Sequence, residues 1–292
     1  MTLLRVATAA AVLIGLAAIA LQLPALSGAA RAQDASDWAA QAHTAARLIA
    51  GVTTRTPAAT FIRAGIEIRL DPDWHTYWRD PGDTGVPPTF DFSGSDNVKS
   101  ARILWPAPES FPDGAGGTSI GYADRVILPL LVTPDNPTQR STLNLKLGYA
   151  VCGNMCVPVE ANLQLALDGS GAEDAAIEKA QSRVPRQVPL GPPTGATNGL
   201  AIIGVHREGG QPHDRVVVDL EAPAQAPVQL FVEGPTPDWS LPQPQPIGDN
   251  GRTRHFRFDL DGLPPGAQAK GATLTFTAVS ATDAIEVPAH LD

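Results

Sequence analysis

Two stretches of alternating hydrophobicity flank a pair of closely spaced cysteines, and they constrain the fold more than any other feature of the sequence. Apolar residues hold the odd-numbered positions in residues 143–151 and again in residues 157–167. Such alternation is typical of a strand with one buried face. Between the two runs, Gly153 and Asn154 are residue types that tolerate positive φ in a tight loop. The sequence therefore predicts an antiparallel β-hairpin with a three-residue loop between the cysteines.

This hairpin would place Cys152 and Cys156 directly opposite each other. Opposed residues of an antiparallel pair have Cα atoms ~4.5–5.5 Å apart, and a disulfide needs ~4.4–6.8 Å. In one continuous strand the two Cα atoms would lie ~13 Å apart, too far for a bond. Both cysteines have even numbers, so we predict that they lie on the polar face, within reach of a partner's thiol. A bulge at Gly148 would change that prediction.

Three uses of the cysteine pair follow from the residues alone. As a structural pin, a disulfide that closes a five-residue loop contributes only ~2 kcal/mol in the chain-entropy model. As a redox pair it is plausible, because an exposed disulfide in a small loop is labile. As a metal site, Cys152 and Cys156 with Met155 between them could hold a soft ion such as Cu(I), and His75 is the nearest histidine in an aromatic context. The residues favour redox exchange and leave the other two uses open.

The composition points to an all-β chain. Pro (28) and Gly (27) make up about a fifth of the 292 residues. Both residue types are disfavoured inside helices, so many short strands joined by turns are expected. About six strand patterns lie on each side of a Pro/Gly-rich connector at residues 185–197. The predicted fold is therefore two immunoglobulin-like β-sandwich domains in tandem.

The predicted organisation begins with a secretory signal peptide at residues 1–32. Arg5 precedes an apolar run at residues 6–21, and a small-x-small cleavage pattern ends at Ala32. An uncleaved anchor is the alternative, although the run is shorter than the ~20 residues of a usual membrane span. The remaining parts are an N-terminal helical segment at 33–54, a redox β-sandwich at 55–168, a helix and Pro-rich linker at 169–197, and a second β-sandwich at 198–292.

Several function classes are disfavoured. The net charge is −9, with 21 basic and 30 acidic residues and no basic run, so we expect no nucleic-acid partner. The sequence lacks the G-x-S-x-G, H-E-x-x-H, P-loop and G-x-G-x-x-G motifs, and we expect no cofactor. Two cysteines cannot form a disulfide-rich scaffold or a four-cysteine zinc site. Whether the chain acts as an enzyme, such as a protein-disulfide reductase or a component of one, is left open.

Three segments of the chain form a recognisable series. Residues 74–88 read WHTYWRDPGDTGVPP, residues 121–129 read GYADRVILP, and residues 149–158 read YAVCGNMCVP. The series resembles the N-terminal periplasmic region of the DsbD-type thiol:disulfide interchange proteins, and most closely the branch associated with suppression of copper sensitivity. The resemblance is good over about residues 55–168 and weaker over residues 198–292.

The resemblance implies an immunoglobulin-like domain whose cysteine pair relays reducing equivalents in the periplasm. A thioredoxin-like or membrane-embedded reductase would reduce the pair, which would then reduce periplasmic disulfide oxidoreductases or isomerases. Carried over by position, Cys156 would form the mixed disulfide with partners and Cys152 would resolve it. A cap loop would fall within residues 111–122, with Phe111 and Tyr122 as the aromatic candidates for covering the disulfide or facing a partner.

The sequence thus predicts an exported, periplasmic protein that is soluble after signal cleavage. The 292-residue sequence carries no membrane domain, so we expect either that a separate protein supplies the electrons or that the relay function has been lost. Two other classes stay open. One is a periplasmic Cu(I)-binding or copper-tolerance protein that uses Cys152, Cys156 and Met155. The other is a non-enzymatic interaction module with a structural disulfide.

Overall fold

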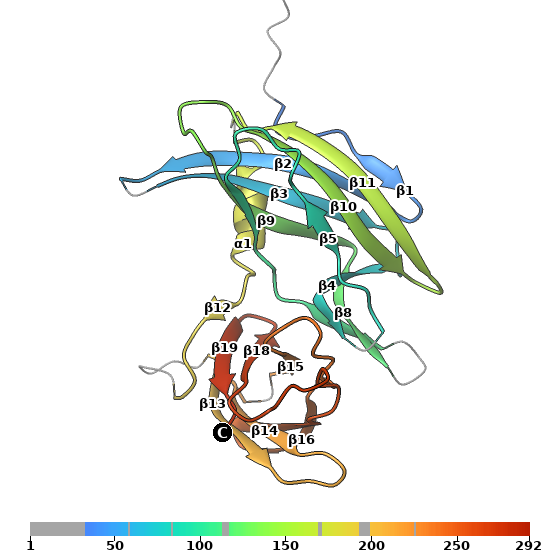
Figure 1. Cartoon of the computed structure of the whole chain (residues 1–292), viewed down its shortest axis with the longest axis vertical. Helices are drawn as coiled ribbons and strands as arrows, with labels where there is room; N and C mark the ends of the chain where they lie inside the picture. Colours follow the sequence, from blue (N-terminus) through green and yellow to red (C-terminus); the bar gives the residue numbers. More distant parts are fainter. Residues whose placement is uncertain are drawn as a thin grey trace, which may run out of the picture. The chain divides into compact units, whose positions relative to one another are not determined.

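The fold is almost entirely β. A computed structural model describes residues 33–57, 59–82, 84–112, 117–168, 171–192, 199–224 and 226–292. Over these residues the chain has nineteen strands and one helix (Figure 1). The strands form four sheets, two in each half of the chain, and the predicted tandem β-sandwich fold is confirmed. The predicted signal peptide lies outside the described residues.

The first sandwich is built from two sheets. One sheet has the strand order β1 (Ala39–Gln41), β2 (Thr44–Arg55), β3 (Thr60–Leu70), β9 (Arg125–Thr133) and β6 (Ser100–Ile103). The other has the order β11 (Cys156–Ala166), β10 (Thr142–Cys152), β4 (His75–Gly82), β8 (Thr118–Ala123) and β7 (Glu109–Pro112), and β5 (Thr89–Asp91) also pairs with β10. The core between them receives the even-numbered residues of β3 from Ile62 to Ile68 and the odd-numbered residues of β10 and β11.

The predicted cysteine hairpin is confirmed as β10 and β11. Their register runs without a shift from Thr142 opposite Ala166 to Cys152 opposite Cys156. No bulge interrupts the ladder at Gly148, so the alternation read from the sequence holds along both strands. The disulfide therefore lies at the end of a long, regular hairpin, on the face opposite the main core.

The helix predicted over residues 33–54 is wrong, because β1 and β2 occupy this segment. Ala46, Leu48 and Ala50 are buried in the core of the first sandwich. They share one face of β2, which pairs along its length with β3. The segment is rich in alanine, the residue with the highest helix propensity, but propensity is a small energy, and pairing with β3 and burial in the core override it.

The second sandwich also has two sheets. One has the order β12 (Arg186–Gln187), β19 (Ala284–His290), β18 (Thr273–Ser280) and β15 (Val228–Glu233). The other has the order β13 (Ala201–Glu208), β14 (Arg215–Glu221), β17 (Thr253–Asp259) and β16 (Gln245–Asn250). Its own core includes Leu220, Phe258 and Phe276. Short strand β12 comes from the segment predicted as linker and pairs in parallel with β19.

The helix α1 (Asp174–Gln181) also lies within the predicted linker, and it packs on the first sandwich. Its Ile177 is fully buried against Ile49 and Ile127. Its Asp174 accepts two hydrogen bonds from the guanidinium of Arg63. The division of the chain at residue 168 stays a prediction, and these contacts favour assigning α1 to the first sandwich. No helix in the described part of the chain is long and apolar enough to cross a membrane.

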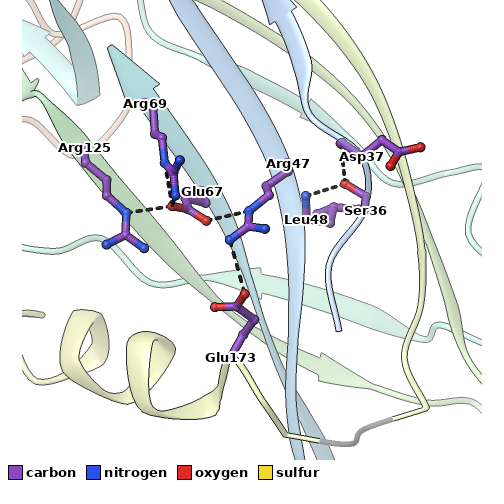
Figure 2. Close-up of polar contacts among 8 residues, drawn as sticks. All are labelled: Ser36, Asp37, Arg47, Leu48, Glu67, Arg69, Arg125 and Glu173. Carbon is purple, nitrogen blue, oxygen red and sulfur yellow. Dashed lines mark hydrogen bonds and ion pairs between the residues drawn. The ribbon is translucent and has the colours of Figure 1, made fainter. Parts of the chain in front are cut away.

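A buried carboxylate organises the outer face of β2, β3 and β9. The side chain of Glu67 is fully buried and forms ion pairs with Arg47, Arg69 and Arg125 (Figure 2). Burial raises the pKa of Glu67, but the hydrogen bonds and charges of Arg47 and Arg125 outweigh it and hold the pKa below its usual value. The guanidinium groups of Arg47 and Arg69 also lie over the ring of Trp38. This cluster ties the segment before β1 to the sandwich.

Candidate redox site at the cysteine hairpin

Cys152 and Cys156 form a disulfide, with their Cα atoms 4.1 Å apart. The two residues differ in exposure: Cys152 is 3% exposed, whereas Cys156 is exposed. Met155, in the loop between them, is 66% exposed. The predicted position on the face away from the main core is correct. Cys152 is nevertheless buried, because Tyr77 and Ala150 pack around it in a small cluster on that face.

Tyr77 links the two sulfurs. Its hydroxyl lies 2.7 Å from Sγ of Cys152 and 3.3 Å from Sγ of Cys156. A disulfide sulfur carries no hydrogen, so the phenol is the donor in both contacts. Tyr77 is 4% exposed, and burial raises the pKa of its hydroxyl, which keeps the proton in place at neutral pH. The site therefore holds a protonated donor directed at the disulfide.

Strand β4 brings this tyrosine to the cysteines. In its ladder with β10, Val151 is opposite Thr76 and Cys152 is opposite His75. The hydroxyl of Thr76 donates a hydrogen bond to the carbonyl of Ala150 at 2.8 Å, which supports the pairing. Tyr77 is not among the site residues predicted from the sequence. The contact joins residues 75 positions apart, so the local pattern contains no signal for it.

His75 connects the disulfide to the β7–β8 hairpin. Its ring stacks on Phe111 at 4.5 Å with an interplanar angle of 6°, and it meets the ring of Tyr77 edge-on at 5.6 Å. Its Nε2 lies 3.0 Å from the hydroxyl of Ser119. Burial lowers the pKa of His75, which favours the neutral ring at pH 7. Phe111, His75 and Tyr77 thus form a continuous aromatic layer that ends at the sulfur of Cys152.

Gly121 permits the close approach of β8 to β4. A Cβ at this position would collide with the carbonyl oxygen of Thr76. Because glycine has no side chain, β8 can pair tightly with β4 beside Tyr77, which is opposite Gly121 in the ladder. The β7–β8 hairpin is thereby held against the strand that carries His75 and Tyr77.

A second aromatic group lies on the other side of the cysteine loop. Trp74 packs on this loop so closely that a Cβ at Gly153 would lie 3.0 Å from its ring. The ring of His43 stacks on Trp74 at 3.9 Å with an interplanar angle of 9°, and its Nδ1 lies 3.0 Å from a carboxylate oxygen of Asp71. The loop that carries the exposed Cys156 therefore rests on a packed support.

The two aromatic cap candidates have different positions. Phe111 lies on β7 and reaches the site through His75. Tyr122 is 5% exposed within the main core, and its hydroxyl donates to the carbonyl of Pro106 at 2.8 Å. Tyr122 therefore does not face a partner, because its position on β8 points to the core side of the sheet. Residues 113–116 of the predicted cap lie outside the described residues.

Further metal ligands beside the two cysteines would favour the Cu(I) alternative. Among the described residues there is no cluster of three or more His, Cys, Asp or Glu side chains suited to a metal ion. His75 is opposite Cys152 in the ladder, but its Nε2 is engaged with Ser119. Met155 shares the exposed loop with Cys156. A Cu(I) site at Cys152, Cys156 and Met155 stays a prediction.

The comparisons with known proteins agree with the resemblance read from the sequence. A comparison with curated proteins gives no match. Among solved structures, the chain is similar to the crystal structure of the N-terminal periplasmic domain of ScsB from Proteus mirabilis, at 21% sequence identity and a TM-score of 0.69. That similarity covers 88% of this chain and 98% of the other, and it supports the fold. Residues 48–168 match the family model described as "Thiol:disulfide interchange protein DsbD, N-terminal", so the resemblance is confirmed for a thiol:disulfide interchange module that carries the cysteine pair.

Proposed function

We propose that this chain is a periplasmic thiol:disulfide exchange protein. Its Cys152–Cys156 pair receives electrons from a thioredoxin-like protein dithiol and passes them to periplasmic disulfide oxidoreductases or isomerases. The observation that carries the proposal is the unequal exposure of the two cysteines, with Cys156 exposed and Cys152 buried beneath Tyr77. Disulfide exchange needs one sulfur open to attack and a second one held in reserve.

In the reductive step, a thiolate of the partner attacks Sγ of Cys156. The bond between Cys156 and Cys152 breaks, a mixed disulfide forms, and Cys152 leaves as a thiolate. The partner's second thiolate then attacks the partner's first sulfur, which is bonded to Sγ of Cys156 in the mixed disulfide. This step releases the thiolate of Cys156. The partner's dithiol becomes a disulfide, and the cysteine pair gains two electrons and, with both thiols protonated, two protons. Delivery to a client protein runs through the same steps in reverse.

Tyr77 supports the assignment of Cys152 as the leaving group. Its hydroxyl lies nearer to Sγ of Cys152 than to Sγ of Cys156, at 2.7 Å against 3.3 Å. When Cys152 leaves, negative charge develops on its sulfur, and hydrogen bonds to charged acceptors are stronger than those to neutral ones. The same donor therefore stabilises the product of attack more than the disulfide. Tyr77 acts at the reacting atoms in this proposal.

The periplasmic location rests on two supports. The N-terminal sequence predicts a secretory signal peptide. The solved structure to which the chain is similar is described as a periplasmic domain. A disulfide persists in that compartment, whereas cytosolic thiols are kept reduced.

The test compares two single-cysteine variants. Cys152→Ala and Cys156→Ala each react first with dithiobis(nitrobenzoate), which leaves the remaining cysteine as a mixed disulfide with thionitrobenzoate and releases one thionitrobenzoate. Each product is then mixed with a reduced thioredoxin-like protein that lacks its resolving cysteine. We expect Cys152→Ala to form a stable mixed disulfide on a non-reducing gel, at least about tenfold faster than Cys156→Ala, because access limits attack on the buried sulfur. Circular dichroism verifies that both variants are folded. Equal rates would remove the assignment of the two sulfurs. Trapping by neither folded variant would favour the structural or the Cu(I) interpretation over exchange.

A further inference from the structure

One strand of the second sandwich contacts the first sandwich through three alternate residues. Gln229, Phe231 and Glu233 all lie on β15, and residues at this spacing share one face of a strand. β15 is also the last strand in the order of its sheet. The partners of these three residues lie on β4 and β7, the strands that carry Tyr77 and Phe111.

The strongest of these contacts is an ion pair. Arg79, two residues after Tyr77, donates two hydrogen bonds to the carboxylate of Glu233, at 2.7 Å and 2.6 Å, and another to Glu286. Its guanidinium also lies 4.4 Å from the centre of the Trp78 ring. Paired hydrogen bonds of this kind fix orientation as well as distance. The end of β4 next to the site is therefore held by β15.

The ion pair is largely removed from water. The exposed fractions of the side chains are 26% for Arg79, 18% for Glu233 and 12% for Glu286. Burial lowers the pKa of Arg79, but the two carboxylates outweigh burial and raise the pKa above its ordinary value. The guanidinium of Arg79 therefore stays charged, and loss of one carboxylate would leave it with half of its compensation.

Of the other two contacts, one adds to the hold on β4 and the other extends it to β7. Phe231 is 3% exposed and lies 5.9 Å from the ring of Trp78. The side-chain amide of Gln229 donates a hydrogen bond to the hydroxyl of Ser110 at 2.6 Å. Ser110 directly precedes Phe111, whose ring stacks on His75. The hydrogen bond therefore acts one residue away from the aromatic layer over the disulfide.

Strand β7 needs such support. It has four residues and lies at the end of its sheet, and within the described part of the chain it pairs only with β8. Short, two-stranded pairings are marginally stable by themselves and gain stability from packing against other elements. Contact with Gln229 restricts the movement that would separate Phe111 from His75.

We propose that β15 of the second sandwich is a positioning element for the redox site. Gln229, Phe231 and Glu233 hold β4 and β7 so that Tyr77 stays on the disulfide and Phe111 stays on His75. This inference rests on the proposed exchange function and assigns a role to the half of the chain that has no cysteine. None of the three residues touches a sulfur, so they are positioning residues. Loosening them exposes the buried side of the disulfide to small thiols.

The test uses the full chain with a double variant, Gln229→Ala with Glu233→Gln. Its matched control is Gln245→Ala with Asp259→Asn, which removes an exposed amide and an exposed carboxylate from the same sandwich. Two quantities are measured: the rate at which dithiothreitol reduces the disulfide, and the redox potential of the pair in glutathione buffers. We expect several-fold faster reduction and a shifted potential in the β15 variant, and wild-type values in the control.

Thermal unfolding verifies that each variant is folded at the assay temperature. If the double variant is not folded, Gln229→Ala alone carries the test, because this side chain is exposed and its removal leaves the ion pair intact. Wild-type rates and potential in the folded β15 variant would overturn the inference. A wild-type chain that dithiothreitol reduces but that no thioredoxin-like protein reduces would instead overturn the proposed function, and the comparison between the two variants would still decide the role of β15.

Discussion

Each sandwich contains a regular antiparallel hairpin, but the two hairpins close in different ways. In the second sandwich, β18 and β19 are joined by a turn in which Ser280 and Asp283 exchange backbone and side-chain hydrogen bonds. In the first sandwich, the longer hairpin of β10 and β11 closes with the Cys152–Cys156 disulfide. The shorter hairpin keeps its register through its strand ladder, its core packing and these polar turn contacts, without a disulfide. A hairpin of this fold therefore needs no disulfide to form, which argues that the cysteine pair serves chemistry.

The surroundings of the two turns also differ in how much of each turn is open to other molecules. Asp283 accepts hydrogen bonds from Arg186 and from the backbone of Leu200, so its polar atoms are engaged within the fold. The cysteine loop instead leaves Met155 and Cys156 exposed above a buried phenol donor. The turn of the second sandwich uses its carboxylate for contacts within the fold, whereas the cysteine loop combines an accessible sulfur with a protected one.

The largest expected effect separates function from stability. Replacing both cysteines with serine should abolish exchange and lower the free energy of unfolding by only about 2 kcal/mol, because the closed loop is short. Asp283→Ala should lower the free energy of unfolding by about 1 kcal/mol through lost hydrogen bonds and leave exchange unchanged. Exchange assays and urea unfolding measure both quantities. If the serine variant loses much more stability than the short loop predicts, the disulfide is a structural pin. The two hairpins then do not differ in the way argued above.

The cysteine hairpin could be predicted from the sequence, because its pairing depends on residues close together in the chain. The cysteine hairpin has eleven-residue strands in which apolar and polar residues alternate, so the residues next to the cysteines are enough to predict its pairing. The N-terminal segment was predicted wrongly because its alanines favour a helix locally, and pairing with the distant strand β3 overrides that local preference.

The parts that could not be predicted depend on contacts between distant residues. Tyr77 reaches the sulfurs through pairing of β4 with β10, and Arg79 reaches Glu233 across 154 positions. Phe111 was identified only through the family resemblance. Tyr122 was proposed on the same basis, but it lies in the core. It shares with Ile120 the face of β8 that points to the core, because side chains alternate between the two faces of a strand. Local patterns define the strands, and the assembled sheets define the site.

The second prediction concerns stability in the first sandwich. Glu67→Gln should lower the free energy of unfolding by about 3 kcal/mol, because it leaves the guanidinium groups of Arg47, Arg69 and Arg125 without their shared carboxylate. The pKa of Glu67 is lowered in the folded state, so its contribution is fully present above its unfolded value of 4.5 and is lost as pH falls through the folded value. Urea unfolding from pH 7 to pH 3 measures this.

The mutant therefore provides its own control for the pH dependence. Wild type should lose stability relative to Glu67→Gln as the pH falls below 4.5, and the two curves should converge. Parallel curves over the whole range would show that Glu67 does not titrate with folding. Exchange activity at neutral pH should be similar in both proteins, because the cluster lies on the other sheet from the disulfide.

A third, smaller effect should come from Tyr77→Phe. The change removes only the hydroxyl that donates to Cys152 and Cys156, and it keeps the ring in its packed position. We expect the loss of about 1–2 kcal/mol of stabilisation of the leaving thiolate, and hence slower reduction by a protein dithiol. Tyr149→Phe is a matched control, because its hydroxyl contacts Thr44 rather than a sulfur. Equal rates in the two variants would remove Tyr77 from the mechanism.

The smallest predicted effect is the titration of His75, which has no equivalent beside the turn of the second sandwich. Burial between Phe111 and Tyr77 lowers its pKa, so the folded state binds its proton less readily than the unfolded chain. The stabilising contribution of the neutral ring is therefore present above pH 6.5 and is lost as pH falls through the lowered value. Titration of the ring protons by NMR should give a pKa below 6.5, and His75→Phe should keep the stacking while removing the pH dependence. A measured pKa above 6.5 would mean that the ring is not buried against Phe111, and the aromatic layer over the disulfide would then be open in solution.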